Sequence, residues 1–326
     1  MARIYRSIAQ FGLAMGVAIL MASTADAQIP TEPMIEATDV EEIIVIARRS
    51  GAPTWTVTEG EATVLLVGSI RDVPEQVEWH PAALENAARR SDRILFPQRP
   101  DISPADILRI IWRSRTLALL PTGKTSADYL SPVWQARLDV LGDRHDQDWS
   151  RQSFFLTAND LLFDTTGLRR GRGTDINDVV RRAAREGRVP IERVGQVRGD
   201  DLIDGLLERG PETWLPCVHA SIVAAEAGPD AVLDRGRAWV RFDIAEVMAS
   251  PVEIALGQCW PYDDSEIGPL VRSQWTVAID RALTEPGVTL AVVPLRLLAT
   301  PGGMLDTLEG RGLEIRGPEW RAAPAD

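Results

Sequence analysis

Apolar residues along the chain fall into two patterns that occupy different parts of the sequence. Short runs rich in β-branched residues and bounded by turn residues are typical of strands. They lie near both ends of the chain, at residues 54–57, 62–67, 94–96, 288–293 and 313–315. Apolar positions three or four apart are typical of helices and fill most of the chain between them. We therefore expect a mixed α/β (α+β) fold, with a central sheet built from N- and C-terminal strands and a largely helical middle.

Proline and glycine positions divide this pattern into elements. A helix is expected over residues 81–90, because proline suits the first turn of a helix, and a second helix over residues 301–312. Breaks in the helical middle are expected at Pro121, Gly142, Gly173 and Pro190.

The first 27 residues have the pattern of a secretory signal peptide. Two arginines precede an apolar run at residues 11–22, which is too short for a bilayer because a spanning helix needs about 20 residues. The small residues Ala25 and Ala27 follow, as signal peptidase requires. We therefore expect export and cleavage before Gln28. No later run approaches membrane length, so the cleaved chain is not expected to span a membrane.

The sequence contains two cysteines, Cys217 and Cys259. Neither follows the cleavage point closely, so no lipid anchor is expected. An even count in an exported chain favours one disulfide between them, and two separate buried thiols are the alternative.

The chain is acidic, with a formal net charge of −12. This balance argues against nucleic acid as a partner, because binding phosphates requires a basic face. The chain after residue 27 is long enough to bury a full core, as one large domain or two smaller ones.

The segment after the cleavage point, residues 28–53, is polar and turn-rich and is expected to be flexible. It contains one β-prone run, VEEIIVIARR, from Val40 to Arg49. This run resembles the TonB box, the energy-coupling segment of TonB-dependent outer-membrane receptors. Such segments add as a strand to the sheet edge of a partner. The alternatives are an edge strand of the domain or a plain linker.

Two strands near opposite ends of the sequence finish in the same way. The strings VLLVGSIR and LAVVPLR end at Arg71 and Arg296. In each, the apolar strand runs into a turn, marked by Gly68 or by Pro294. Ligands commonly bind at the carboxyl ends of strands in α/β sheets, so both arginines are candidate site residues.

Two segments resemble the signatures of the TraB/GumN family. The first, residues 55–97, includes VLLVGSI and SDRIL, and the second, residues 290–315, includes PGGMLDTL and RGL. The resemblance implies a TraB/GumN-like domain over residues 54–317, followed by a tail at residues 318–326. Together with the signal-peptide pattern and the TonB-box-like run, it places the protein in the periplasm.

Members of the family carry a G-x-x-H motif at each of the two strand ends and a glutamate after the first. In relatives that act as metalloproteases, such as the Tiki proteins, these residues are thought to form a metal site. This sequence keeps Gly68 but has Arg71 and Arg296 at the histidine positions and Pro97 at the glutamate position. A guanidinium stays protonated and offers no lone pair, so it cannot replace a histidine ligand. We expect no metal or other cofactor at this degenerate site.

Two interpretations of Arg71 and Arg296 remain. They form a site that binds a carboxylate or phosphate, or each is a structural arginine paired with a neighbouring acid. An alternative metal site would combine His145 with Asp146 and Asp148.

The function expected from these residues is that of a catalytically degenerate pseudo-metalloprotease in the cell envelope. Its role would be binding or scaffolding, with an envelope protein or a small anionic ligand as its partner. The alternative is a metal-independent hydrolase, or an anionic-ligand-binding enzyme, that uses Arg71 and Arg296 to hold its substrate.

Overall fold

The computed structural model describes residues 37–98, 103–168, 175–259, 261 and 266–322. Every described residue belongs to one compact unit. The expected signal peptide and its cleavage point before Gln28 lie outside the described residues.

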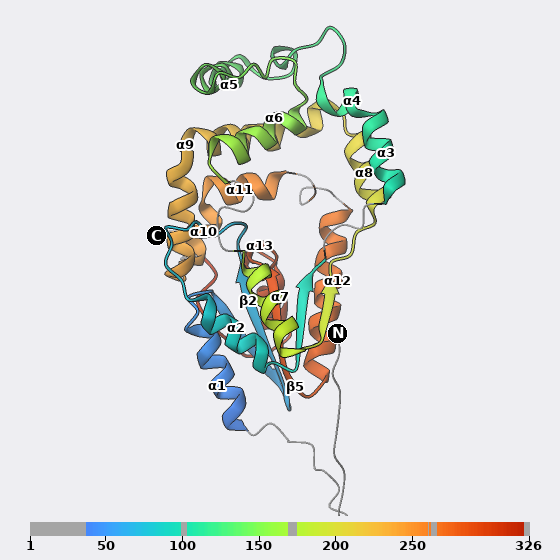
Figure 1. Cartoon of the computed structure of the whole chain (residues 1–326). Coiled ribbons are helices and arrows are strands. Elements are labelled where there is room, and N and C mark those ends of the chain that lie inside the picture. Colours follow the sequence, from blue (N-terminus) through green and yellow to red (C-terminus); the bar gives the residue numbers. More distant parts are fainter. Residues whose placement is uncertain (1–36, 99–102, 169–174, 260, 262–265, 323–326) are drawn as a thin grey trace, which may run out of the picture. The chain divides into compact units, whose positions relative to one another are not determined.

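The described strands form one six-stranded sheet in the order β4-β3-β5-β2-β1-β6 (Figure 1). Strands β4, β3, β5 and β2 are parallel, whereas β1 is antiparallel to both of its neighbours. The strands are β1 Thr54–Glu59, β2 Ala62–Ser69, β3 Arg93–Pro97, β4 Ile191–Val194, β5 Gly287–Pro294 and β6 Ile315–Arg316. The expected mixed α/β fold with a sheet built from both ends of the chain is therefore confirmed.

Helices connect and cover these strands (Figure 1). The first are α1 Ala37–Arg48, α2 Pro81–Arg90, α3 Pro104–Trp112, α4 Ser114–Ala118, α5 Pro132–His145, α6 Phe154–Asp160 and α7 Ile176–Gly187. The later ones are α8 Gly199–Glu208, α9 Leu215–Val240, α10 Ile244–Ala249, α11 Pro251–Gln258, α12 Ile267–Thr284, α13 Leu295–Ala299 and α14 Met304–Gly310. Short helical turns are η1 Ser126–Asp128, η2 Leu161–Thr165 and η3 Pro211–Trp214.

The main hydrophobic core lies on the two faces of the sheet. All eight residues of β2 are buried, so this strand is at the centre of the core. Helix α2 packs against α7, and α12 contacts β2 and β4. Because crossovers between parallel strands are right-handed, α2 and α7 cover one face and α12 covers the other.

A second core forms within the helical middle. Leu141 of α5, Phe154 of α6 and Val218 of α9 are fully or almost fully buried in it. Helix α9 joins the two cores, because its later residues Ala238 and Trp239 belong to the main core. It bends at Gly228, whose φ of 68° is outside the helical region, and Pro229 follows.

The interpretation of residues 40–49 as a strand is wrong, because the run is helical as far as Arg48. The segment forms α1, which packs against α2 and the main core. The apolar residues of one helical face are spaced by three or four positions and are buried or partly buried: Val40, Ile43, Ile44 and Ala47. This face is already inside the protein, so we do not retain the strand-addition interpretation.

Two further elements differ from the sequence expectation. Gly142 does not break a helix but lies near the end of α5, where a Cβ atom would come within 2.7 Å of the backbone oxygen of Gln147. Strand β4 lies in the part of the chain expected to be largely helical, because its four residues, IERV, place two charged residues between two apolar ones and show no strand alternation. The expected break at Gly173 lies outside the described residues.

The described part of the C-terminal tail packs against the domain. Trp320 is 8% exposed and belongs to the main core. The indole of Trp55 donates a hydrogen bond of 2.8 Å to the carbonyl oxygen of Pro318. None of the helices in the described part of the chain combines the length and the apolar character needed to cross a bilayer.

The Sγ atoms of Cys217 on α9 and Cys259 just after α11 lie at disulfide distance, and their Cα atoms are 4.7 Å apart. The expected pairing of the two cysteines is therefore present in the structure. It joins two helices that already pack against each other.

Loss of this disulfide should destabilise the domain. The bond closes a loop with a sequence separation of 42, for which the chain-entropy model gives about 4 kcal/mol. We expect a reductant to lower the free energy of unfolding, measured by urea denaturation, by about this amount. The variant Cys217→Ser/Cys259→Ser should show the same loss without reductant and no further response to it. Equal stability of the oxidised and reduced protein would contradict this prediction.

Candidate functional site

The three positions singled out in the sequence meet at one edge of the sheet. Strands β2 and β5 are parallel neighbours, with Ser69 paired to Pro294 at their carboxyl ends. Arg71 and Arg296 therefore follow adjacent strand ends. Strand β3, which ends at Pro97, lies parallel to β5 on its other side.

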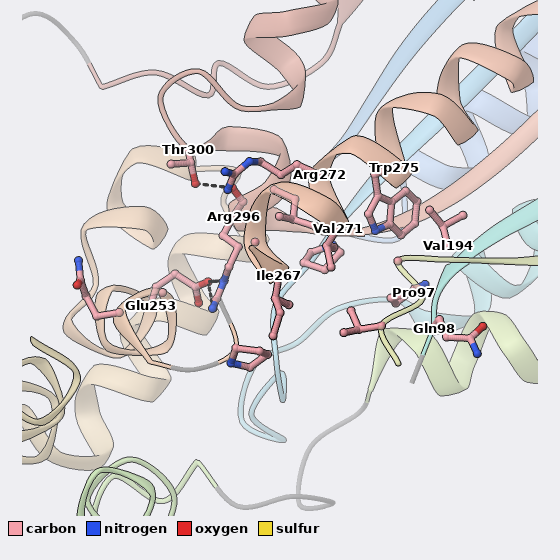
Figure 2. A pocket seen from close by; sticks show the side chains of 18 of the residues that line it. Pro97, Gln98, Val194, Glu253, Ile267, Val271, Arg272, Trp275, Arg296 and Thr300 are labelled. Atoms are coloured by element: carbon pink, nitrogen blue, oxygen red, sulfur yellow. Dashed lines mark hydrogen bonds and ion pairs between the residues drawn. The ribbon is translucent and has the colours of Figure 1, made fainter. Parts of the chain in front are cut away.

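A buried carboxylate organises this edge. Glu253 of α11 is 4% exposed, and its Oε1 accepts hydrogen bonds from Nε, at 3.0 Å, and Nη2 of Arg296. Its Oε2 accepts from Nη1 of Arg235 on α9 at 2.9 Å. Arg235 is 1% exposed, so the three groups form a buried ion cluster, which we call the Glu253 cluster. Figure 2 shows the guanidinium of Arg296 directed at Glu253.

The cluster also holds the end of β2. Arg235 donates through Nη2 to the carbonyl oxygen of Arg71. The residue that follows, Asp72, has a φ of 51°, and its charge helps to keep Arg235 protonated. The side chain of Arg71 is exposed and lies over the ring of Phe163, at 5.1 Å from its centroid.

Gly68 is required at the end of β2 for packing. A Cβ atom at this position would lie 2.8 Å from the side chain of Leu295 and 3.0 Å from that of Trp55. Its carbonyl oxygen accepts a hydrogen bond of 2.8 Å from the indole of Trp239. This glycine therefore brings α9 and α13 close to the strand end, which is a structural reason for its presence.

Opposing effects set the pKa of Glu253. Burial raises the pKa, but the positive charges and hydrogen bonds of Arg296 and Arg235 outweigh it and hold the pKa below its ordinary value. The pKa of Arg235 is lowered by burial despite the attraction of Glu253, although an arginine remains protonated at physiological pH. The cluster is therefore fully ionised.

A pocket of about 500 Å³ opens beside the cluster at the carboxyl ends of β3 and β5. Its polar lining includes Arg272, Arg296 and Glu253 (Figure 2). Its apolar lining includes Val194, Ile267, Val271, Trp275 and Leu297. Pro97 also lines the pocket, whereas Arg71 is not among its described lining residues.

Arg272 is a pocket residue that the sequence did not suggest. It lies on α12, is exposed, and makes no ion pair with any described residue, in contrast to Arg296. Glu253 and Arg235 were also missed, because they lie in helices without a recognisable motif. An acid inside the apolar string PVEIALGQ was a usable signal, since buried glutamates are rare unless paired.

The donors at this edge do not suit a metal ion. The side chain of Pro97 has no atom that can ligate a metal, and Arg71 and Arg296 offer no lone pairs. Both carboxylate oxygens of Glu253 already accept hydrogen bonds from guanidinium groups. Within the described ranges, no three histidine, cysteine, aspartate or glutamate side chains gather as a candidate metal site. The alternative set of His145, Asp146 and Asp148 is therefore not brought together.

Removing the charge of Glu253 should destabilise the domain, because two arginines would remain near each other in a buried site. We expect Glu253→Gln to lower the free energy of unfolding by about 3–5 kcal/mol. The matched variant Glu246→Gln removes an exposed ion pair with Arg241 and should cost about 0–1 kcal/mol. Urea denaturation of both variants measures the difference, and equal effects would contradict the prediction. Replacing all three cluster residues with methionine should recover much of the loss.

The same cluster predicts how stability depends on pH. The folded-state pKa of Glu253 lies below its unfolded value of about 4.3. The contribution of the ionised Glu253 to the free energy of unfolding is therefore fully present above about pH 4.3. It is lost as the pH falls through the folded-state pKa. The wild-type protein should therefore lose more stability on acidification below about pH 4.3 than the triple methionine variant, which has no such carboxylate. Parallel pH profiles of the two proteins would refute this assignment.

Comparison with known proteins agrees with the resemblance noted in the sequence. No curated protein and no solved structure matches the chain significantly. A model of the TraB/PrgY/gumN family matches residues 53–317, which is most of the chain and includes the strand ends, the Glu253 cluster and the pocket. The chain therefore belongs to the TraB/PrgY/gumN family.

Proposed function

We propose that this protein is an exported, non-catalytic member of its family that binds a small amphiphilic anion in the periplasm. The observation that carries the proposal is the pocket at the carboxyl edge of the sheet. It has apolar walls and two guanidinium groups, from Arg272 and Arg296, and the second of these is at a position where the family signature leads to a metal ligand.

The shape and lining of the pocket support a ligand with an apolar body and one anionic group. Its volume of about 500 Å³ is in the range of small-molecule sites. Val271 and Trp275 offer contact to an apolar body, and the guanidinium of Arg272 suits a carboxylate, which it can bind through two parallel hydrogen bonds. The sulfonate or phosphate of a similar molecule would meet the same groups.

The state of Glu253 supports binding rather than catalysis. A general base needs a lone pair directed at the substrate and a pKa near the working pH. Both oxygens of Glu253 accept hydrogen bonds from arginines, and its pKa is held below the ordinary value. It is the carboxylate that lines the described part of the pocket, so a metal-independent hydrolase would have to use it.

Arg71 contributes differently from Arg296 in this proposal. Arg296 orders the pocket through its ion pair with Glu253, while the backbone of Arg71 closes the cluster from the other strand end. The exposed guanidinium of Arg71 remains a candidate for a ligand group that extends out of the pocket.

The proposed location rests on the signal-peptide pattern and is supported by the cysteine pair at disulfide distance, since such bonds persist in oxidising compartments. The tests of location and of binding are independent.

The export proposal predicts the N-terminus of the mature protein. Mass spectrometry of protein recovered from the periplasm should find a chain that begins at Gln28. The variant Ala25→Leu/Ala27→Leu places large side chains at the cleavage site and should leave the precursor uncleaved. A periplasmic chain that starts elsewhere would correct the site, and retention of the wild-type protein in the cytoplasm would contradict export.

The binding proposal predicts that dodecanoate, a carboxylate with an apolar chain, binds the pocket. Calorimetry should detect binding of dodecanoate, whereas acetate and dodecanol should bind much more weakly. Arg272→Gln should weaken dodecanoate binding by about tenfold, the loss expected when one charge-assisted contact is removed. The control variant Arg237→Gln, on the exposed surface of α9, should leave dodecanoate binding unchanged.

Blocking the pocket provides a second test. Gly257 lines the pocket, and a Cβ atom there would meet nothing within 4 Å, so Gly257→Phe should fill the space without disturbing the fold. Gly310→Phe, at an equally open position on α14 outside the described pocket lining, is the matched control. Binding that survives Gly257→Phe would place the ligand elsewhere. Hydrolysis of ester or peptide substrates that is lost in Glu253→Gln would favour the hydrolase instead.

A further inference from the structure

Helix α3 exposes an unusual concentration of large apolar side chains. Their exposed fractions are 50% for Ile107, 67% for Leu108, 62% for Ile111 and 86% for Trp112. These positions lie on one side of a helix, because they are one, four and five residues apart. We call them the α3 apolar face. Other large exposed apolar residues of the described chain are scattered, with at most two on any other helix.

The opposite side of α3 explains why the helix is held in this orientation. Asp106 is buried and forms a capping box with Ser103 at the helix start. Arg109 is ion-paired with Asp204 of α8, against which α3 packs. In Figure 1, α3 lies on the outer side of α8. The helix is therefore attached through its polar groups, and its apolar face points away from α8.

Arginines border the face at its C-terminal end. Arg113 and Arg115 are exposed, and neither makes an ion pair with a described residue. An apolar helical face with a tryptophan and flanking arginines is the pattern of segments that lie in the interface of a membrane. Tryptophan is favoured at the headgroup level, and arginine attracts anionic lipids.

We propose that the α3 apolar face docks this protein onto the surface of an anionic phospholipid bilayer, with Arg113 and Arg115 as a local basic border on a chain that is acidic as a whole. A second copy with its α3 parallel to this one would bring Arg113 and Arg115 of both copies together, whereas an anionic lipid surface offers negative charge to these arginines in any orientation of the helix. Water-exposed apolar area of this density is unfavourable unless something covers it. The lipid surface covers the apolar side chains and pairs the arginines at the same time.

Vesicle flotation tests the proposal with the protein as purified from cells, so that its N-terminus is the natural one. Vesicles of phosphatidylglycerol mixed with phosphatidylcholine should carry the protein, and vesicles of phosphatidylcholine alone should carry much less. Leu108→Glu/Trp112→Glu should reduce the bound fraction at least tenfold. Arg113→Gln/Arg115→Gln should reduce it about fivefold for each arginine, and high salt should have a similar effect.

The matched control is Val140→Glu/Val277→Glu, which places the same charges at exposed valines of α5 and α12. It should bind vesicles as the wild type does, and circular dichroism should show that both glutamate variants are folded. Three results would overturn the proposal: no binding of the wild type to anionic vesicles, equal loss in the control, or equal binding to neutral vesicles. A dimer that dissociates in Leu108→Glu/Trp112→Glu, without vesicle binding by the wild type, would assign the face to a second copy instead.

Discussion

The structure of the sheet edge depends on one buried carboxylate, that of Glu253, held between Arg235 and Arg296. A charge removed from water must be compensated by partners with good geometry, or it destabilises the fold strongly. Three helices, α9, α11 and α13, supply these groups, so they are restricted to positions in which all the groups are paired. The hydrogen bond from Arg235 to the carbonyl of Arg71 extends this restriction to the end of β2.

The Glu253 cluster also determines what chemistry the edge can support. In open α/β sheets the carboxyl ends of the strands form the usual ligand site, and this chain keeps a pocket there. The guanidinium groups of Arg272 and Arg296 line this pocket and offer no lone pair to a cation. The disulfide-distance pair joins α9 and α11, the two helices that carry Arg235 and Glu253, and so reinforces the same arrangement.

Several features were predictable because they depend on neighbouring residues alone. The strands near both ends of the chain, the helix over residues 81–90 and the similar strand ends that lead to Arg71 and Arg296 follow from local pattern and turn chemistry. The same kind of reasoning failed for residues 40–49, where β-branched residues suggested a strand. Burial of one face against α2 and the core outweighs that weak local preference.

The fold class and the family could be predicted from the residue pattern, and so could the arginines that follow two of the strands. A guanidinium offers no lone pair to a cation whatever its surroundings. The partners of these arginines depend on the tertiary structure. Glu253 lies 18 residues from Arg235 and 43 from Arg296 in the chain, and Arg272 reaches the pocket from a separate helix. These residues are not separated by any regular sequence spacing that a motif search could find. The packing of the helices on the sheet brings them together.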